Sequence, residues 1–137
     1  GHNVIESDMQ VEDSDYADAE AVINSNPDVV IKTVYRDQKD GIMADNYLPP
    51  EEADYTFAKE EMKSREGFSK MKAIEDDNII MCSDFCLRGG GNTVGLAFFA
   101  KWLHPDLFED FDAYEIFDQW MTEFQNMDAI EGHVYEG

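Results

Sequence analysis

Two arginines in a strongly acidic chain are the residues whose type and spacing most suggest chemistry. The 137 residues include 31 Asp and Glu against 10 Lys and Arg, a formal charge of −21. Arg36 follows a run rich in β-branched residues, Val29 to Tyr35, and Arg88 follows a second apolar run, Asn78 to Cys82. If both runs are strands of an open parallel sheet, these arginines lie near its carboxyl ends, where such sheets bind ligands. Guanidinium groups there would attract a carboxylate or another anionic group, and structural ion pairs with neighbouring acids are the alternative role.

Aromatic and glycine residues accompany the two arginines. Tyr35 and Phe85 would add contact area to the same ligand mouth, or would simply pack. The run Gly89 to Gly91 leads into a helix start, where backbone amides can hold an anion. It matches neither a GxxxxGK[ST] loop nor GxGxxG, so a sharp turn is the simpler interpretation.

The sequence contains few of the residue patterns that are typical of enzymes. The three histidines, His2, His104 and His133, lack metal-ligand spacing to one another, and no Gly-x-Ser-x-Gly elbow occurs. The sequence therefore predicts neither an enzyme nor a cofactor. Cys82 and Cys86 are too few for a structural zinc site. Outside the cell they could form a disulfide, and two partly buried thiols are the alternative.

Alternating strand and helix signals predict the fold class. Beyond the two strands, helices are expected from the Asp18 cap to Asn26-Pro27, from Pro49-Pro50 to about Ser64, from the triglycine to Leu103, and after the Asp112 cap. In the last helix one face is apolar, formed by Phe117, Trp120, Met121 and Phe124. The prediction is a single α/β domain over residues 1–137, a three-layer lobe with a small, mainly parallel sheet flanked by helices. Residues 126–137 are expected to be a tail.

Three segments in order carry a resemblance to a known family. They are Asp18 to Ile31 with its Asn-Pro-Asp turn, Glu66 to Ile74, and the helix end Lys101-Trp102-Leu103-His104-Pro105 with its following Phe108. Together they resemble the C-terminal lobe of solute-binding proteins that serve ABC importers of iron-siderophore, haem and cobalamin complexes. The lobe fold in that family is chelatase-like.

The resemblance implies a function and a set of partners. The chain would be the C-terminal lobe of a two-lobed extracytoplasmic protein, lacking its N-terminal lobe, that captures a metal-chelate or corrinoid ligand and delivers it to an ABC permease. Glu20, early in its helix, would dock to permease arginines, and the loop holding Arg88 would face the cleft between lobes. A cell-surface interaction domain that kept the lobe fold is the alternative, and an enzyme of the chelatase-like fold is a remote third.

Composition excludes other partners. An acidic chain is a poor ligand for nucleic acid, which requires Lys and Arg to neutralise phosphates. The longest apolar stretch, Val94 to Leu103, is far shorter than the roughly 20 residues of a membrane helix, so a soluble domain is expected. Gly1-His2 reads as a cloning remnant, and an export signal and membrane anchor are expected upstream, in the full-length protein.

Overall fold

The computed structural model describes residues 2, 18–42 and 48–135. These form two compact units. Unit 1 combines residues 1–31 with residues 59–80, and unit 2 combines residues 32–58 with residues 81–137.

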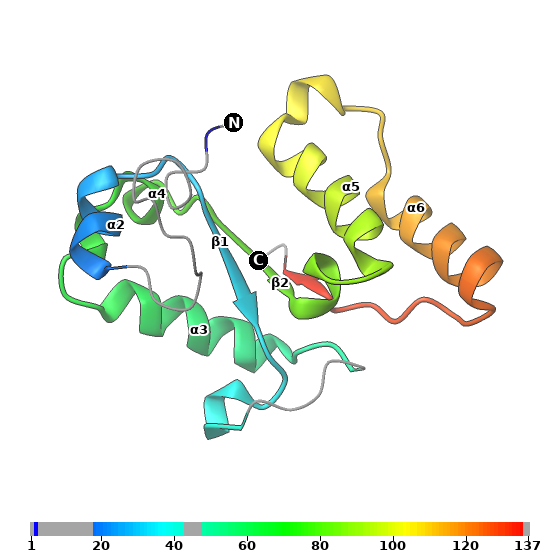
Figure 1. The fold of residues 1–137 in the computed structure, drawn as a ribbon, viewed down its shortest axis with the longest axis horizontal. Helices are drawn as coiled ribbons and strands as arrows, with labels where there is room; N and C mark the ends of the chain where they lie inside the picture. Colours follow the sequence, from blue (N-terminus) through cyan, green and yellow to red (C-terminus); the bar gives the residue numbers. More distant parts are fainter. Residues whose placement is uncertain (1, 3–17, 43–47, 136–137) are drawn as a thin grey trace. The chain divides into compact units, whose positions relative to one another are not determined.

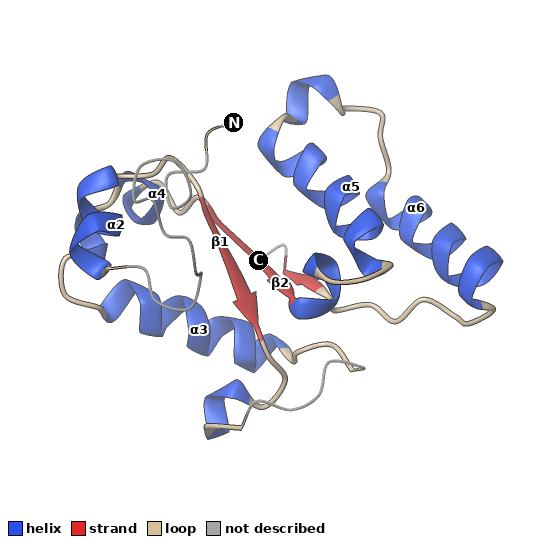
Figure 2. Cartoon of the chain, in the orientation of Figure 1, coloured by secondary structure: helices blue, strands red, loops and turns tan. Residues whose placement is uncertain are grey.

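In the described residues one helix precedes β1, and two helices lie between each strand and the next (Figures 1 and 2). The helices are α2 (Ala19–Ser25), α3 (Glu52–Ser64), α4 (Lys72–Glu75), α5 (Gly91–Leu103) and α6 (Ala113–Gln119), and the strands are β1 (Val30–Val34), β2 (Ile79–Ser83) and β3 (Val134–Tyr135). Short 3-10 turns lie at Gln38–Asp40, Phe68–Lys70, Asp84–Leu87 and Pro105–Leu107, and α6 continues as a π turn over Trp120–Gln125. None of the described helices is long and apolar enough to cross a membrane.

The strands form one sheet in the order β1-β2-β3. The Val30 amide donates to the Asn78 carbonyl at 3.1 Å, so β1 and β2 begin side by side and run in the same direction (Figure 2). Strand β3 pairs antiparallel to β2, with Met81 opposite Tyr135 and Cys82 opposite Val134. The predicted α/β class with a small sheet flanked by helices is confirmed. The antiparallel strand β3 lies in the segment expected to be a tail. It was not predicted, because two residues are too few to show an alternating pattern.

In unit 1 the Asn-Pro-Asp turn leads from α2 to β1 and is hydrogen-bonded to the start of α4. Asp18 caps α2 by accepting the Glu20 amide at 3.2 Å. Asn26 ends the helix in the left-handed region, φ 44°, and its side-chain oxygen accepts the Lys72 amide at 2.8 Å. The Pro27 carbonyl accepts the Ala73 amide at 3.1 Å, and the Lys72 ammonium pairs with Asp28. The turn therefore has a structural role in unit 1, whose small core consists of Met62, Met71 and Ile74.

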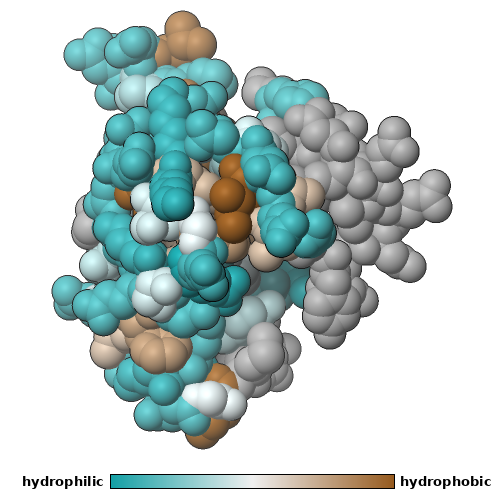
Figure 3. Space-filling model, turned by 90° about the vertical axis from the view of Figure 1, so that its left-hand side faces the viewer, coloured by the Kyte–Doolittle hydropathy of each residue, from teal (hydrophilic) through white to brown (hydrophobic). Residues whose placement is uncertain are grey.

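On the face shown in Figure 3, hydrophilic side chains predominate and hydrophobic ones form separate small patches.

The core of unit 2 lies between β2, β3, α5 and α6. Asp112 caps α6 by accepting the amides of Tyr114 and Glu115 at 2.9 and 3.2 Å. The apolar face predicted for this helix packs inward at Phe117 and Met121, which are buried, but Phe124 is 72% exposed. The apolar face of this helix therefore extends beyond the core that it covers. The buried residues of this cluster are Cys82, Cys86, Val94, Ala97, Phe98, Ala113, Phe117, Met121 and Val134.

Candidate functional site

The candidate site is the edge of the sheet where β1 and β2 end. Because these strands begin together and run in parallel, their carboxyl ends share one edge, the position where open α/β sheets bind ligands. Tyr35 and Arg36 follow β1, and the Asp84–Leu87 turn with Arg88 follows β2. All four residues predicted from the sequence belong to unit 2. We call this edge, defined by Tyr35, Arg36, Phe85 and Arg88, the rim.

Arg36 is held by the segment that opens α3. Its Nη1 donates to the Pro49 carbonyl at 3.0 Å, and its Nη2 pairs with the Glu51 carboxylate at 2.9 Å. The side chain is 29% exposed. These contacts match the structural role that the sequence left open for Arg36. A ligand at this residue would have to share the guanidinium with Glu51.

A buried carboxylate, Asp54, holds the loop after β1 that contains Arg36. This carboxylate was not predicted from the sequence. Asp54 is fully buried and accepts the amides of Asp37 and Glu51 at 3.1 and 3.0 Å. The Lys39 amide lies at 3.4 Å and the Lys39 ammonium at 3.5 Å. Burial alone would raise the pKa of Asp54, but the backbone hydrogen bonds and the lysine outweigh it and hold this pKa below the usual value. The signal was present, since Asp54 stands three residues after Glu51, the spacing of a capping box.

Arg88 is the more available of the two arginines. Its Nε lies 2.8 and 2.7 Å from the two carboxylate oxygens of Asp84, which is itself buried. The Arg88 side chain is nonetheless 75% exposed. Asp84 therefore orients a guanidinium whose outer part faces solvent.

The two aromatic residues of the rim differ from the arginines in their surroundings. The Phe85 ring contacts Phe117, Trp120 and His133, with centroid separations of 5.8, 5.9 and 4.5 Å. These are contacts of the unit 2 core, and the ring is partly buried. Tyr35 is partly buried, and its amide donates to the Gln38 side chain at 3.1 Å.

Behind the rim lies a buried polar group that also escaped the sequence analysis. His133 Nδ1 lies 2.7 Å from Ser83 Oγ, and both residues are buried. The Ser83 amide donates to the His133 carbonyl at 2.7 Å, next to the β2–β3 pair. Cys82 and Cys86 are buried free thiols beside this pair, and the Cys86 sulfur lies 3.6 Å from the His133 carbonyl. His133, expected to lie in a tail, is thus a core residue.

Burial of His133 gives the fold a pH dependence. It lowers the pKa of His133 to about 4 from an ordinary 6.5, so the folded histidine is neutral when an unfolded one takes up a proton. Unfolding free energy should therefore fall with pH from about 6.5 down to about 4. Between pH 6.5 and 5 we expect a loss of about 2 kcal/mol, measured by urea unfolding.

The matched variants are His133→Asn and His104→Asn. Asparagine at position 133 keeps a hydrogen-bond partner for Ser83 without titrating, so the unfolding free energy should depend less on pH between pH 6.5 and 5. The same change at the exposed His104 should leave this pH dependence unaltered. An unchanged slope in His133→Asn would show that the histidine is not its source.

Glu20 lies in unit 1, exposed in the first turn of α2. The exposure expected of a docking carboxylate is present. An acid here also complements the helix dipole, so the local structure alone does not single it out. Among the described residues no group of three or more His, Cys, Asp or Glu side chains could hold a metal ion.

No protein-family model and no curated protein matches the sequence. Among solved structures, the fold is similar to that of the TroA-like periplasmic binding protein FepB from Veillonella parvula, with a TM-score of 0.70 and 20% sequence identity. The match covers 91% of this chain and 36% of that protein, so the chain spans about a third of its length. The fold of part of a TroA-like binding protein, which the sequence resemblance predicted, is confirmed.

Proposed function

We propose that this chain is one lobe, the C-terminal one, of the solute-binding component of an ABC importer. In this proposal it acts outside the cytoplasm, captures an iron-siderophore or corrinoid-like complex between two lobes, and delivers it to the permease without catalysing a reaction. The observation that carries the proposal is the likeness of nearly the whole chain to about a third of a TroA-like periplasmic binding protein. The second lobe, the ligand and the permease all belong to the proposal.

Ligand contact is assigned to the rim, with unequal roles. Arg88 is exposed and oriented by Asp84, so it is the residue best able to bind an anionic group of the ligand. Arg36 would contribute through the guanidinium that it shares with Glu51. Tyr35 offers a partly exposed ring, and Phe85 supports the turn from the core side. This division follows from exposure, because a side chain already packed in a core gains little by touching a ligand.

Docking is assigned to Glu20, and charge reversal there tests the importer function. In a two-lobed protein containing this chain, Glu20→Lys should impair permease-stimulated ATP hydrolysis, because like charges at an interface penalise association. Ligand affinity should be unchanged. Stability should change by about 0.5 kcal/mol or less, as is usual for an exposed side chain.

The control is Glu60→Lys, which reverses another exposed carboxylate of unit 1, on α3. It should leave stimulated hydrolysis intact. Because the other lobe could compensate, the decisive variant reverses the corresponding glutamate in both lobes. Normal transport by that double variant would contradict docking through Glu20, and a protein that neither binds ligand nor stimulates a permease would favour a cell-surface interaction domain.

A further inference from the structure

Helix α5 has an exposed apolar face. Leu96 is 61% exposed and Leu103 41%, and beyond the helix end Leu107 is 78% exposed. Phe99 and Ala100, between the two helical leucines, are partly buried. The opposite side of α5 packs into the core of unit 2 through Val94, Gly95, Ala97 and Phe98. We call the set formed by the exposed Leu96 and Leu103 and the partly buried Phe99 and Ala100 the α5 face.

The α5 face carries no charge, although the chain has a formal charge of −21. Lys101 is the one charged residue of the helix, and its ammonium donates to the Phe111 carbonyl at 2.9 Å. A helix that is apolar on both sides is ordinarily buried on both sides. Exposed apolar surface of this kind marks an interaction site.

The spacing on this face is self-complementary. Leu96 and Leu103 are seven residues apart, two helical turns or about 10.5 Å along the axis. Their midpoint lies between Phe99 and Ala100. A twofold axis through that midpoint sets Leu96 of one copy against Leu103 of the other, with the small Ala100 near the crossing. Such an isologous contact uses the same surface on both copies.

The charges at the two ends of α5 favour the same antiparallel arrangement. Asp106, Glu109 and Asp110 follow its C-terminal end, and the Lys101–Phe111 hydrogen bond folds this segment back against the helix. Carboxylates near a helix C-terminus interact unfavourably with its dipole, whereas they are stabilising near an N-terminus. The first turn of α5 has no acidic residue. In an antiparallel pair, the carboxylates of each copy approach the N-terminal end of α5 in the other.

We propose that this chain associates with a second copy of itself through the α5 face, as a twofold dimer with antiparallel α5 helices. The α5 face itself is apolar, so the occupant should offer an apolar surface, and the same face of a second copy is one. One helix pair buries less area than a standard interface, so the dimer should dissociate in the micromolar range.

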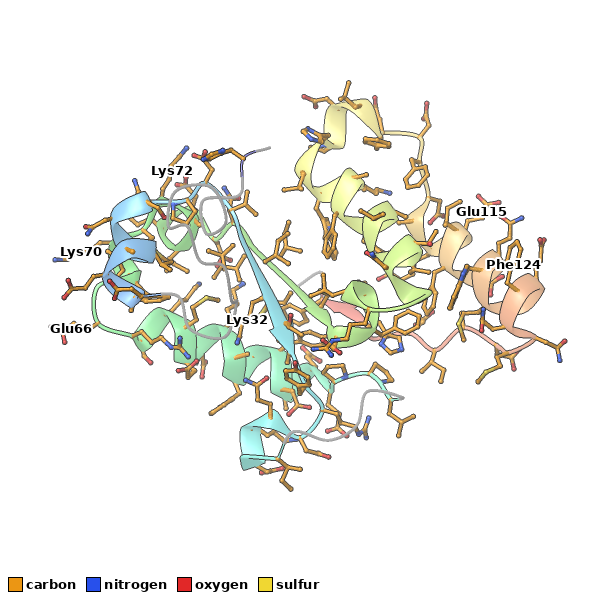
Figure 4. The ribbon with its side chains drawn as sticks, in the orientation of Figure 1. Lys32, Glu66, Lys70, Lys72, Glu115 and Phe124 are labelled. Carbon is orange, nitrogen blue, oxygen red and sulfur yellow. The ribbon has the colours of Figure 1, made fainter. Side chains whose placement is uncertain are left out.

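Sedimentation velocity of the 137-residue chain between about 1 µM and about 500 µM tests this, since that range brackets micromolar dissociation. We expect a monomer–dimer equilibrium. Leu96→Glu and Leu103→Glu should each weaken it at least tenfold while leaving the circular dichroism spectrum unchanged. Phe124→Glu alters a more exposed apolar residue, in the π turn that continues α6, and should have no such effect (Figure 4).

Two further measurements fix the geometry. Ala100→Cys, near the axis, should form a disulfide-linked dimer on mild oxidation, whereas Thr122→Cys on the α6 segment should not. The double variant Glu109→Lys/Asp110→Lys should weaken the dimer, although it lowers the net negative charge. Glu115→Lys, which also lowers it, should not weaken the dimer (Figure 4).

A monomer at every concentration would overturn the proposal, leaving another protein or a further part of a longer polypeptide as the occupants to test. A dimer insensitive to Leu96→Glu and Leu103→Glu would overturn it equally.

Discussion

Gly95→Ala is expected to destabilise the protein by about 3 kcal/mol or more, because it adds a methyl group where α5 meets the turn that carries the rim. A Cβ at this position would overlap the Cys86 carbonyl oxygen and lie 2.8 Å from the carbonyl carbon. The atoms that it meets are backbone, and they belong to the Asp84–Leu87 turn, which cannot withdraw as a flexible side chain would. The opposing effect is helix propensity, which favours alanine over glycine by about 1 kcal/mol. The steric cost therefore exceeds the gain in helix propensity, and the variant is less stable.

Urea unfolding measures the difference, and Asn92→Ala is the matched control. Asn92 is exposed in the first turn of the same helix, so a new alanine there should change the unfolding free energy by about 0.5 kcal/mol or less. If Gly95→Ala were as stable as the parent, α5 and the turn could not be as closely packed as described. Because Arg88 follows this turn, the variant should also disturb the rim.

The sequence predicted α2, α3, α5, α6 and the two main strands because their local signals agree with their tertiary environment, whereas the four-residue helix α4 was not predicted. Asp18 and Asp112 accept helix amides as expected of N-caps. Asn26-Pro27 ends α2, and Pro105 follows α5. Each signal acts within a few residues, so it can be read without knowledge of the fold. The edge shared by Arg36 and Arg88 was predicted for a related reason, since parallel strands place their ends together.

The rest of the site depends on contacts between residues far apart in sequence. His133 belongs to the core because β3 pairs with β2, and a two-residue strand leaves no pattern to detect. The partners of Arg36 come from the start of α3, after an intervening loop. Phe85 faces the core because α6 packs over it. Such pairings are set by the fold, so the residue types alone left their roles open.

Asp54→Ala is expected to cost about 4 kcal/mol, because it removes a buried carboxylate and leaves two backbone amides and the Lys39 ammonium without their acceptor. The carboxylate joins two segments: the loop after β1, through the Asp37 amide and the Lys39 ammonium, and the start of α3, through the Glu51 amide. Losing it should loosen the backbone that holds Tyr35 and Arg36. Asp54→Asn should cost less, about 2 kcal/mol, since one amide oxygen still accepts while the NH₂ group faces a donor.

The ionised carboxylate also makes this contribution depend on pH. Because its pKa is lower in the folded state than its ordinary 3.8, the stability it supplies is complete above that value and is lost as the pH falls through the folded pKa. Asp54→Asn should remove this acid-dependent component, whereas Glu52→Gln, at an exposed acid of the same helical turn, should keep it and alter stability by about 0.5 kcal/mol or less.

Urea unfolding at neutral pH and below pH 4 measures both effects, and hydrogen exchange at the Asp37 and Glu51 amides reports the loop directly. Those two amides should lose protection in Asp54→Asn, because their acceptor has changed. Unaltered protection would mean that the loop after β1 is held by Arg36 and its partners without Asp54.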